Sequence, residues 1–382
     1  MTIHCERTGS LRNVTELYAQ FPTVESKEKS AVQNCSVIKD ELMNRVLAVL
    51  LALFCTGPAL FAQSNTPILS GTVAFLGSTT GGANTYEPFL SPVLAFPIGD
   101  HWLIESRAEI EGFIARQNGT SGPYNGQYFD SLDYAQVDYI ANSHLTVVVG
   151  RFLTPFNIYN ERFPVWIANL EDSPIIYPIG TRTSGSSNGG MVRGVAVSRE
   201  KWIVNYTAYF SAAQTTENLR AGRAAGGRVG VFLPQAGLEV GASYQRFLQN
   251  GGYNASGAYW SWQPPQIPLD VRGEYAHSPG GHGYWLEAAF KLGRSRDSST
   301  WLSRLQPVAR VQQFFKGTPI PGDVLPNANV NQYDFGLNYY FPHYIRLNGS
   351  YGRQYTTGGN ANIWNFGLTY RFLFPAWPGA HQ

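Results

Sequence analysis

The chain has 382 residues, of which 14% are charged and 14% are aromatic, with 40 glycines and a formal net charge of +2. This composition is rich in residues that form strands and turns and poor in those that fill helices, which excludes a helix-rich protein. The basic residues are scattered along the chain, which argues against a nucleic-acid partner. We therefore expect an all-β protein, and one large barrel can account for this length.

The N-terminal region contains a predicted secretory signal at residues 43–62. A basic residue, Arg45, precedes an apolar run from Val46 to Cys55, and the small residue Ala62 precedes the expected cleavage point. The apolar run is too short to span a bilayer, for which about twenty residues are needed. We therefore expect this segment to be removed during secretion.

The sequence before the signal shows no periodic pattern. Residues 1–42 are therefore interpreted either as a wrongly assigned start of translation or as a disordered cytoplasmic extension. All three cysteines of the chain, Cys5, Cys35 and Cys55, lie before the expected cleavage point. A mature chain without thiols fits passage through an oxidising compartment. Residues 63–382 are predicted to form a single barrel domain.

Short runs with alternating apolar and polar residues continue through the mature chain and are separated by turn-forming residues. They predict sixteen strands, at residues 67–76, 91–98, 102–116, 128–140, 145–152, 191–198, 202–211, 228–233, 237–248, 255–263, 269–277, 283–292, 305–316, 332–341, 344–355 and 361–374. An even strand number, with long and short connections in alternation, is typical of an outer-membrane β-barrel.

The strand predicted at 102–116 has one apolar and one charged face. Ile104, Ile110 and Ile114 share the first face, whereas Glu105 and Arg107 begin a charged series on the second. Several charges in a row on the buried face of a soluble sandwich would be costly, but they are tolerable where that face lines water. Later strands repeat the pattern, so we expect a water-filled interior.

Aromatic residues gather at strand ends near the expected periplasmic turns. They are Phe96, Trp102, Trp202, Trp262, Trp301, Phe341, Tyr344, Phe372 and Phe374. This distribution indicates an aromatic girdle at a membrane interface. The alternative is a secreted soluble β-sandwich whose core these residues fill, but the ionisable residues on the opposite faces argue against it.

The connection between the fifth and sixth predicted strands is the exception to this regular pattern. Within residues 147–190, about forty residues carry charges and aromatics without a single period, and long connections of this kind are usually functional. Pro155, Pro164, Pro174 and Pro178 restrict its course without demanding ladder hydrogen bonds.

The start of this connection, GRFLTPFN at residues 150–157, resembles the phosphate-selective porins and the related dicarboxylate porins of Gram-negative bacteria. The resemblance implies an all-β, transmembrane antiparallel β-barrel of about 16 strands, usually trimeric, whose third outer loop folds inward to narrow a channel. Outer-membrane lipid and lipopolysaccharide would then surround the barrel. The scarcity of lysine and the sequence PAWPGAHQ after Phe374 depart from the family pattern.

On this interpretation, two groups of residues are candidates for solute selection. The constriction in the third loop is expected to include Glu161, Arg162, Trp166, Glu171, Asp172 and Arg182. The basic residues lining the lumen are expected to be Arg107, Arg151, Arg193, Arg272, Arg310, Arg346 and Arg371. Arginine can guide anions, and opposed charges across a constriction select solutes. The alternative is that these residues only pair with one another and hold the loop against the wall.

Signals for an enzyme are weak. His277, Ser278 and His282 are the only cluster that suggests a nucleophile or a metal, and their spacing lacks a recognised ligand pattern. We expect no catalytic residue, cofactor or metal. The predicted function is an outer-membrane porin for passive diffusion of small hydrophilic solutes, with a weak anion bias. The alternative is a barrel with a plugged lumen that acts as a scaffold, adhesin or enzyme.

Overall fold

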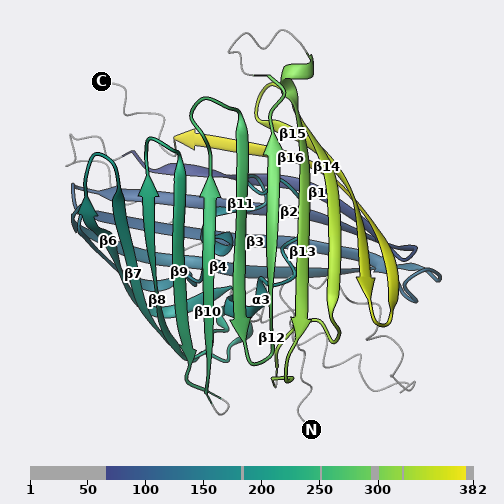
Figure 1. Ribbon diagram of the computed structural model, residues 1–382, viewed down its shortest axis with the longest axis horizontal. Coiled ribbons are helices and arrows are strands. Elements are labelled where there is room, and N and C mark those ends of the chain that lie inside the picture. Colours follow the sequence, from purple (N-terminus) through teal and green to yellow (C-terminus); the bar gives the residue numbers. More distant parts are fainter. Residues whose placement is uncertain (1–65, 182–184, 250–251, 294–300, 321, 376–382) are drawn as a thin grey trace, which may run out of the picture. The chain divides into compact units, whose positions relative to one another are not determined.

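The computed structural model describes residues 66–181, 185–249, 252–293, 301–320 and 322–375. Within these ranges, sixteen antiparallel strands form a closed barrel in which each strand pairs with its sequence neighbours (Figure 1). The first and last strands, β1 and β16, also pair and complete the ring. The predicted extension and signal, residues 1–62, lie outside the described residues.

The strands vary in length around the barrel. Their bounds are β1 Ile68–Thr80, β2 Ala83–Ile98, β3 Trp102–Arg116, β4 Tyr124–Asn142, β5 Leu145–Leu153, β6 Ser186–Ser198, β7 Ile203–Ala212, β8 Ala224–Leu233, β9 Leu238–Phe247, β10 Tyr253–Trp262, β11 Leu269–Ser278, β12 Gly281–Phe290, β13 Leu305–Lys316, β14 Val330–Tyr340, β15 Ile345–Thr356 and β16 Gly359–Pro375. Two short α-helices, α2 Tyr159–Arg162 and α3 Pro178–Thr181, lie between β5 and β6, and the 3-10 helices η2 Glu217–Leu219 and η3 Trp301–Arg304 lie in later connections. No helix in the described ranges is both long and apolar enough to cross a membrane.

The predicted strand number and fold class are confirmed, but several predicted strands were too short. The sequence indicated a loop between residues 76 and 91, whereas β1 and β2 run almost to each other and join through Gly81 and Gly82, with φ of 59° and 89°. Polar residues at the ends of both strands obscured the alternation. The β4 strand likewise begins earlier than predicted and spans 19 residues, against 10 in β7.

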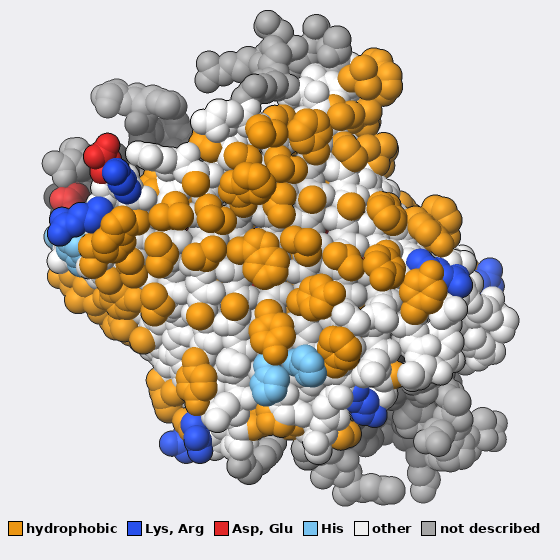
Figure 2. All heavy atoms as spheres, viewed as in Figure 1, with side chains coloured by type: hydrophobic (Ala, Val, Ile, Leu, Met, Phe, Trp, Pro, Cys, Tyr) orange, Lys and Arg blue, Asp and Glu red, His pale blue; other side chains and the backbone are white. Residues whose placement is uncertain are grey.

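The barrel is apolar outside and polar inside. In β14, Tyr333, Phe335 and Leu337 expose 47%, 62% and 48% of their surface, whereas Asp334 between them exposes 3%. Figure 2 shows hydrophobic side chains spread over the strands, with lysine and arginine toward the margins. A closed ladder satisfies every strand's backbone groups and leaves no edge, as a bilayer requires. The fold is that of a multi-pass membrane β-barrel.

Aromatic side chains form the predicted girdle at the barrel end that carries the β2–β3 turn. Most residues of the predicted set are exposed, namely Phe96, Trp102, Trp202, Trp262, Trp301, Phe341, Tyr344 and Phe374, and Phe372 is half-buried. Trp102 packs on Tyr139 with ring centroids 4.8 Å apart. Amphipathic rings of this kind favour the level of the lipid headgroups.

The expected alternation of long and short connections holds only in part. The end of the barrel that carries the long segment 154–185 also carries two-residue turns at 81–82, 279–280 and 357–358. At the opposite end, residues 291–304 form a long connection that contains η3. Connection length alone therefore assigns the two ends less clearly than the aromatic girdle does.

A register shift between β3 and β4 changes which residues face the interior. The shift lies between Arg107 and Ala108, which pair with Tyr134 and Leu132 and leave Asp133 as an extra residue on β4. A bulge of this kind re-aims side chains. Here Asp133 bonds to the Arg107 guanidinium, and that guanidinium also lies 5.5 Å from the centroid of the Tyr134 ring.

Phe335, near the middle of the outward face of β14, provides a test of the lipid-facing surface. The Phe335→Arg substitution should lower the free energy of unfolding in lipid vesicles by about 2–4 kcal/mol, because a guanidinium near the bilayer midplane is costly. The matched control is Asn331→Arg, on the same face but near the strand end, where the cost is about 0–1 kcal/mol. Urea titration of the refolded barrel measures both, and equal losses would contradict a lipid-facing β14.

Candidate functional site

The long connection between β5 and β6, residues 154–185, is the candidate site and is here called the β5–β6 segment. Residues 154–181 and 185 of it are described. Its backbone and side chains contact inward-facing residues of strands far along the sequence.

The start of the segment is held by a carboxylate of β11. The Glu274 carboxylate accepts hydrogen bonds from the backbone N–H groups of Ile158 and Tyr159, at 2.8 and 2.7 Å, and from the Trp285 indole N–H at 3.2 Å. Two of these donors are backbone groups at the beginning of α2, where a side-chain acceptor is otherwise absent. These hydrogen bonds from Ile158 and Tyr159 hold the beginning of α2 against β11.

Asn157 makes the turn that leads into α2. Its φ of 53° lies in the left-handed region, which asparagine tolerates better than most residues. Its side-chain amide donates to the Tyr275 carbonyl at 3.1 Å. Gly257 on β10 makes room for it, because a Cβ there would lie 2.4 Å from the Asn157 Oδ1.

Two ion pairs bind α2 to the neighbouring wall. Arg228 on β8 donates to the Glu161 carboxylate and to the Asn157 carbonyl, both at 2.5 Å. Arg162 forms a bidentate pair with Glu239 on β9, with N···O distances of 2.6 and 2.9 Å. Pairs with two parallel bonds fix orientation as well as proximity.

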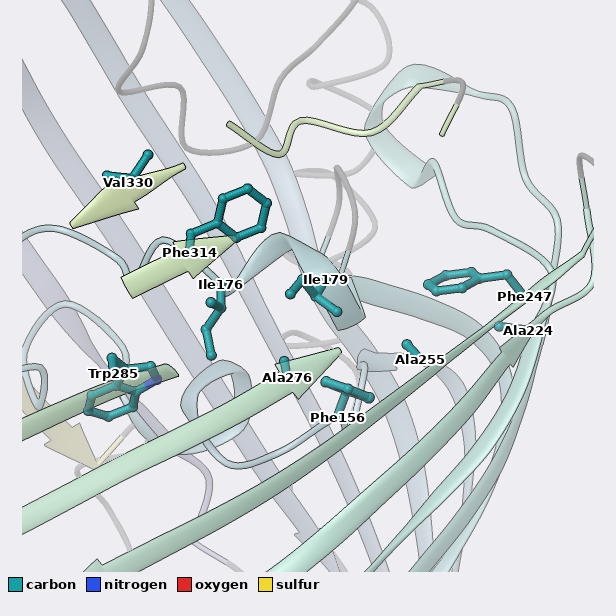
Figure 3. Close-up of a cluster of buried hydrophobic side chains, with 10 residues drawn as sticks. All are labelled: Phe156, Ile176, Ile179, Ala224, Phe247, Ala255, Ala276, Trp285, Phe314 and Val330. Atoms are coloured by element: carbon teal, nitrogen blue, oxygen red, sulfur yellow. The ribbon is translucent and has the colours of Figure 1, made fainter. Parts of the chain in front are cut away.

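Apolar residues of the segment pack inside the barrel (Figure 3). Phe156, Ile176 and Ile179 join a buried cluster whose other members come from β8 to β14, namely Ala224, Phe247, Ala255, Ala276, Trp285, Phe314 and Val330. Figure 3 shows Ile176 near Phe314, and Ile179 on the short helix α3. Removing such side chains from water stabilises the attachment, so part of the barrel interior is an ordinary hydrophobic core.

The phenol groups of the segment are also buried. Burial raises the pKa of Tyr159 and of Tyr177 above the ordinary value for a phenol, and both are neutral in the physiological range. The Tyr177 hydroxyl donates to the Asn160 side chain at 2.8 Å, and the Tyr159 ring packs edge-on against Trp285 at 5.9 Å. These residues therefore contribute packing and polarity rather than charge.

Residues 165–172 of the segment bind to β13, β14 and β15. Arg346 donates to the carbonyls of Val165 and Ala168 at 2.7 and 2.6 Å, and Arg310 donates to the Asp172 carbonyl at 2.7 Å. The Asn338 amide donates to the Asn169 carbonyl at 3.0 Å. Irregular backbone inside the barrel thus has its carbonyls satisfied by the wall, as buried polar groups require.

The tip of the segment, formed by Val165 and Trp166, reaches the first three strands. Val165 packs against a small apolar cluster of β1 and β2, Ala74, Leu76 and Phe89. The Arg107 guanidinium lies 5.9 Å from the centroid of the Trp166 ring. The segment therefore touches both the β8–β15 wall and the β1–β3 wall.

The predicted constriction residues have different surroundings. Glu161 and Arg162 pair with β8 and β9 as described, and Trp166 lies at the tip. Asp172 accepts from the Asn365 amide on β16 at 2.6 Å, and Glu171 lies beside Gly367, where a Cβ would meet its carboxylate. Arg182 lies outside the described residues.

Most of the predicted lumen arginines face inward and have partners. Arg107 pairs with Asp133 at 2.7 Å, Arg193 with Asp138 at 2.6 Å, and Arg272 with Glu287 at 2.8 Å. Arg310 pairs with Asp334 at 3.3 Å, and Arg346 binds the carbonyls named above. Arg371 has the inward register of Thr369 but is exposed near the end of β16. These contacts correspond to the alternative in which the arginines hold the segment and the wall together.

The prediction for Arg151 was wrong. Its neighbours Val148 and Phe152 are fully buried, whereas Val149 exposes 59% of its surface to the outside, so Arg151 shares the outward face with Val149. There its guanidinium is covered by the Leu132 carbonyl at 2.5 Å, the Asn188 side chain at 3.0 Å and the Arg220 carbonyl at 3.4 Å. The apolar run of β5 has no polar face, so alternation could not assign its inner side.

Residues of the β7–β8 connection complete the cover over the Arg151 guanidinium. The Asn188 amide donates to the Leu219 carbonyl at 2.7 Å, and the Asn218 amide donates to Asp130 on β4 at 2.9 Å. Residues around η2 therefore fold over the outer face of β4 to β6 rather than over the lumen.

Sequence reasoning did not identify three acidic residues and one arginine of the barrel wall that bind the segment. They are Arg228, Glu239, Glu274 and Glu287. All four occupy inward positions, on β8, β9, β11 and β12, so periodicity could have marked them as lumen residues, although not as partners of the segment.

His277 and His282 are paired neighbours on β11 and β12. His277 and His282 are exposed, with ring centroids 5.9 Å apart, and His282 stacks on Phe315 at 5.0 Å. Among the described residues, no group of three or more histidine, cysteine or acidic side chains could hold a metal ion.

Comparisons with known proteins agree with this architecture. No protein-family profile and no curated protein sequence matches the chain. Among solved structures, the barrel is similar to an anion-selective porin from Comamonas acidovorans, with a TM-score of 0.55 and 12% identity over 81% of this chain and 100% of that one. It is also similar to OmpT, an outer membrane protein of Vibrio cholerae, in a loop L8 deletion mutant (TM-score 0.53, 11% identity, 81% and 100% covered) and in the outer-membrane expressed form (0.51, 10%, 81% and 99%). The resemblance to porins is thus confirmed at the level of the fold, an outer-membrane multi-pass β-barrel.

Arg346 provides a test of how the segment is attached. In the Arg346→Ala variant, two hydrogen bonds from a charged donor are lost and two buried carbonyls remain, at about 1.5–3 kcal/mol for each bond. Limited proteolysis of the folded barrel should therefore cut within residues 160–175 faster than in the unmodified protein. The matched control is Arg353→Ala, on the same strand but next to the outward Tyr355 ring. Equal cleavage rates in the two variants would show that Arg346 does not hold the segment.

Proposed function

We propose that the chain is a porin of the outer membrane of a Gram-negative bacterium, which lets small hydrophilic solutes diffuse passively and has no enzymatic activity. The observation that carries the proposal is the division of the barrel into an apolar outer face and an inner face of charged and amide side chains. A wall of this kind is stable with lipid on one side and water on the other.

The β5–β6 segment sets the size limit of the channel in this proposal. Support comes from its contacts on opposite sides of the ring of strands, with Glu239 on β9 and with the apolar cluster of β1 and β2. A segment held at both places divides the interior and leaves a narrower passage. Its apolar and ionic anchors keep that passage constant, so the filter does not depend on a mobile loop.

A plugged barrel is the second candidate, and the apolar cluster around Phe156 and Ile176 favours it. Ten buried side chains in contact inside the barrel leave that part of the lumen dry. In a plugged barrel this cluster would serve only stability, and the outer loops would carry an adhesive, scaffold or enzymatic role. Conductance separates the two candidates.

The weak anion bias expected from the arginines loses much of its support. It required guanidinium groups that are available to solute, whereas Arg107, Arg193, Arg272 and Arg310 pair with carboxylates. An ion pair presents little net charge to a passing solute, so the sign of selectivity depends on the charges outside these pairs.

The proposal includes export through a secretory signal and assembly into a homotrimer. A secretory signal at residues 43–62 would direct the chain to the periplasm, and the porin fold supports a homotrimer surrounded by outer-membrane lipid and lipopolysaccharide. An oligomer three times the mass of the refolded chain, which dissociates on heating in detergent, is the expected result on a gel.

Planar bilayers provide the functional test. The refolded mature chain should give discrete conductance steps, and deletion of residues 164–179 should raise the conductance of each step, because the tip and part of the anchor are removed. The matched control is deletion of residues 217–219 of η2, which cover the outer wall and should leave the conductance unchanged. An absence of steps in the unmodified protein would overturn the channel, and an unchanged step size in the segment deletion would overturn its role as constriction.

A further inference from the structure

The hairpin of β11 and β12 places two histidines opposite each other on the outer face of the barrel. His277 and His282 are direct partners in the strand register, next to the two-residue turn at 279–280. Both are exposed and share the outward face with Tyr275 and Tyr284. Along the chain, four residues separate the two histidines, an interval that matches no recognised ligand spacing. The turn converts that interval into direct opposition.

The two imidazole rings are close enough to act on one ion. Their centroids are 5.9 Å apart and their planes are inclined by 36°. Directly opposed residues of antiparallel strands have Cβ atoms about 4.5–5.5 Å apart. Two imidazole nitrogens bound to one tetrahedral zinc ion lie about 3.3 Å apart, since each Zn–N bond is about 2.0–2.1 Å long. Rotation about the broad χ2 torsions of the histidines brings ring nitrogens to that separation.

The surrounding strands hold this pair in place. The ladder between β11 and β12 pairs all ten residues of each strand, so the two backbones are fixed relative to each other. On the next strand, β13, Phe315 is the register partner of His282 and stacks on its ring at 5.0 Å and 20°. A ligand pair that the fold has already ordered loses little conformational entropy when it binds an ion.

The pair lies where dissolved ions can reach it. His277 and His282 are each one residue from a strand end, and that end of the barrel is opposite the aromatic girdle. Strands of about 9–11 residues span the bilayer, so the ten-residue strands β11 and β12 bring the pair to the outer rim. Access from the external solution therefore does not require an open lumen.

From this geometry we propose that His277 and His282 form a bidentate site for a divalent transition-metal ion, of the class that includes Zn²⁺, Ni²⁺ and Cu²⁺. Imidazole nitrogen is a ligand that suits these ions. In the ranges that the structure describes, no third histidine, cysteine or carboxylate joins the pair. Water oxygens therefore complete the coordination. Structural zinc sites are closed by four protein ligands, so this site holds an exchangeable ion from outside the cell.

The test is calorimetric titration of zinc chloride into the refolded mature barrel in detergent, prepared without a polyhistidine tag. His277→Gln and His282→Gln should each weaken zinc binding about a hundredfold, because a chelate that loses one arm loses its effective concentration. The double variant should bind no more weakly than either single variant, since the two rings act as a unit. The matched control is His343→Gln, at an exposed histidine in the β14–β15 turn, which should keep the unmodified affinity.

Three results would overturn the site. They are zinc binding to the unmodified protein that is no tighter than to the double variant, a loss of affinity in only one of the two single variants, and an equal loss in the His343→Gln control. Heat-modifiable mobility on a gel establishes that each variant is folded.

Electron paramagnetic resonance of the unmodified protein loaded with Cu²⁺ gives a measurement that does not depend on the variants. Coupling of the copper to two equivalent ring nitrogens is expected, and coupling to a single nitrogen contradicts the bidentate site.

Discussion

Closure of the hydrogen-bonded ladder is the constraint on which the rest of this structure depends. The pairing of β1 with β16 leaves no strand edge, so each strand can contact lipid on one face and water on the other. Residues such as Phe335 and Asp334 can then be neighbours in sequence and lie in opposite surroundings. The lumen that results is large enough to admit irregular chain, and the β5–β6 segment occupies part of it with its own core and its own ion pairs.

The segment explains why a lumen rich in arginine has few arginines that are available to a solute. Backbone that leaves regular secondary structure inside a barrel needs donors for its carbonyls, and Arg346 and Arg310 supply them at Val165, Ala168 and Asp172. Arg228 and Arg162 serve the same end through Glu161 and Glu239. The basic residues thus act first as structural elements. Counting them predicts the sign of the interior poorly, because pairing removes most of their charge from the passage.

Period-two alternation predicted most of the fold from sequence. The alternation of Glu105, Arg107 and Glu109 with isoleucines assigned the inner face of β3, and similar patterns gave the strand number. It failed where both faces are apolar, as around Arg151 on β5, and where polar residues extend a strand beyond the bilayer, as at the β1–β2 hairpin. The anchors of the segment were beyond reach for another reason. Arg346 and Ala168 are 178 residues apart, and no local pattern specifies which inward residue a distant loop will meet.

The unequal strand lengths have a consequence for how solutes arrive. A tilted strand of about 9–11 residues spans a bilayer, which β7 to β12 match with 10 residues each. The β2, β3 and β4 strands have 16, 15 and 19 residues. Because the aromatic girdle lies at one end of these strands, their additional residues extend beyond the bilayer at the other end. The rim of the barrel at that end is therefore uneven, and it is lower on the side formed by β7 to β12. If the barrel is a channel, the shorter strands β7 to β12 form the side of its rim that obstructs an approaching solute least.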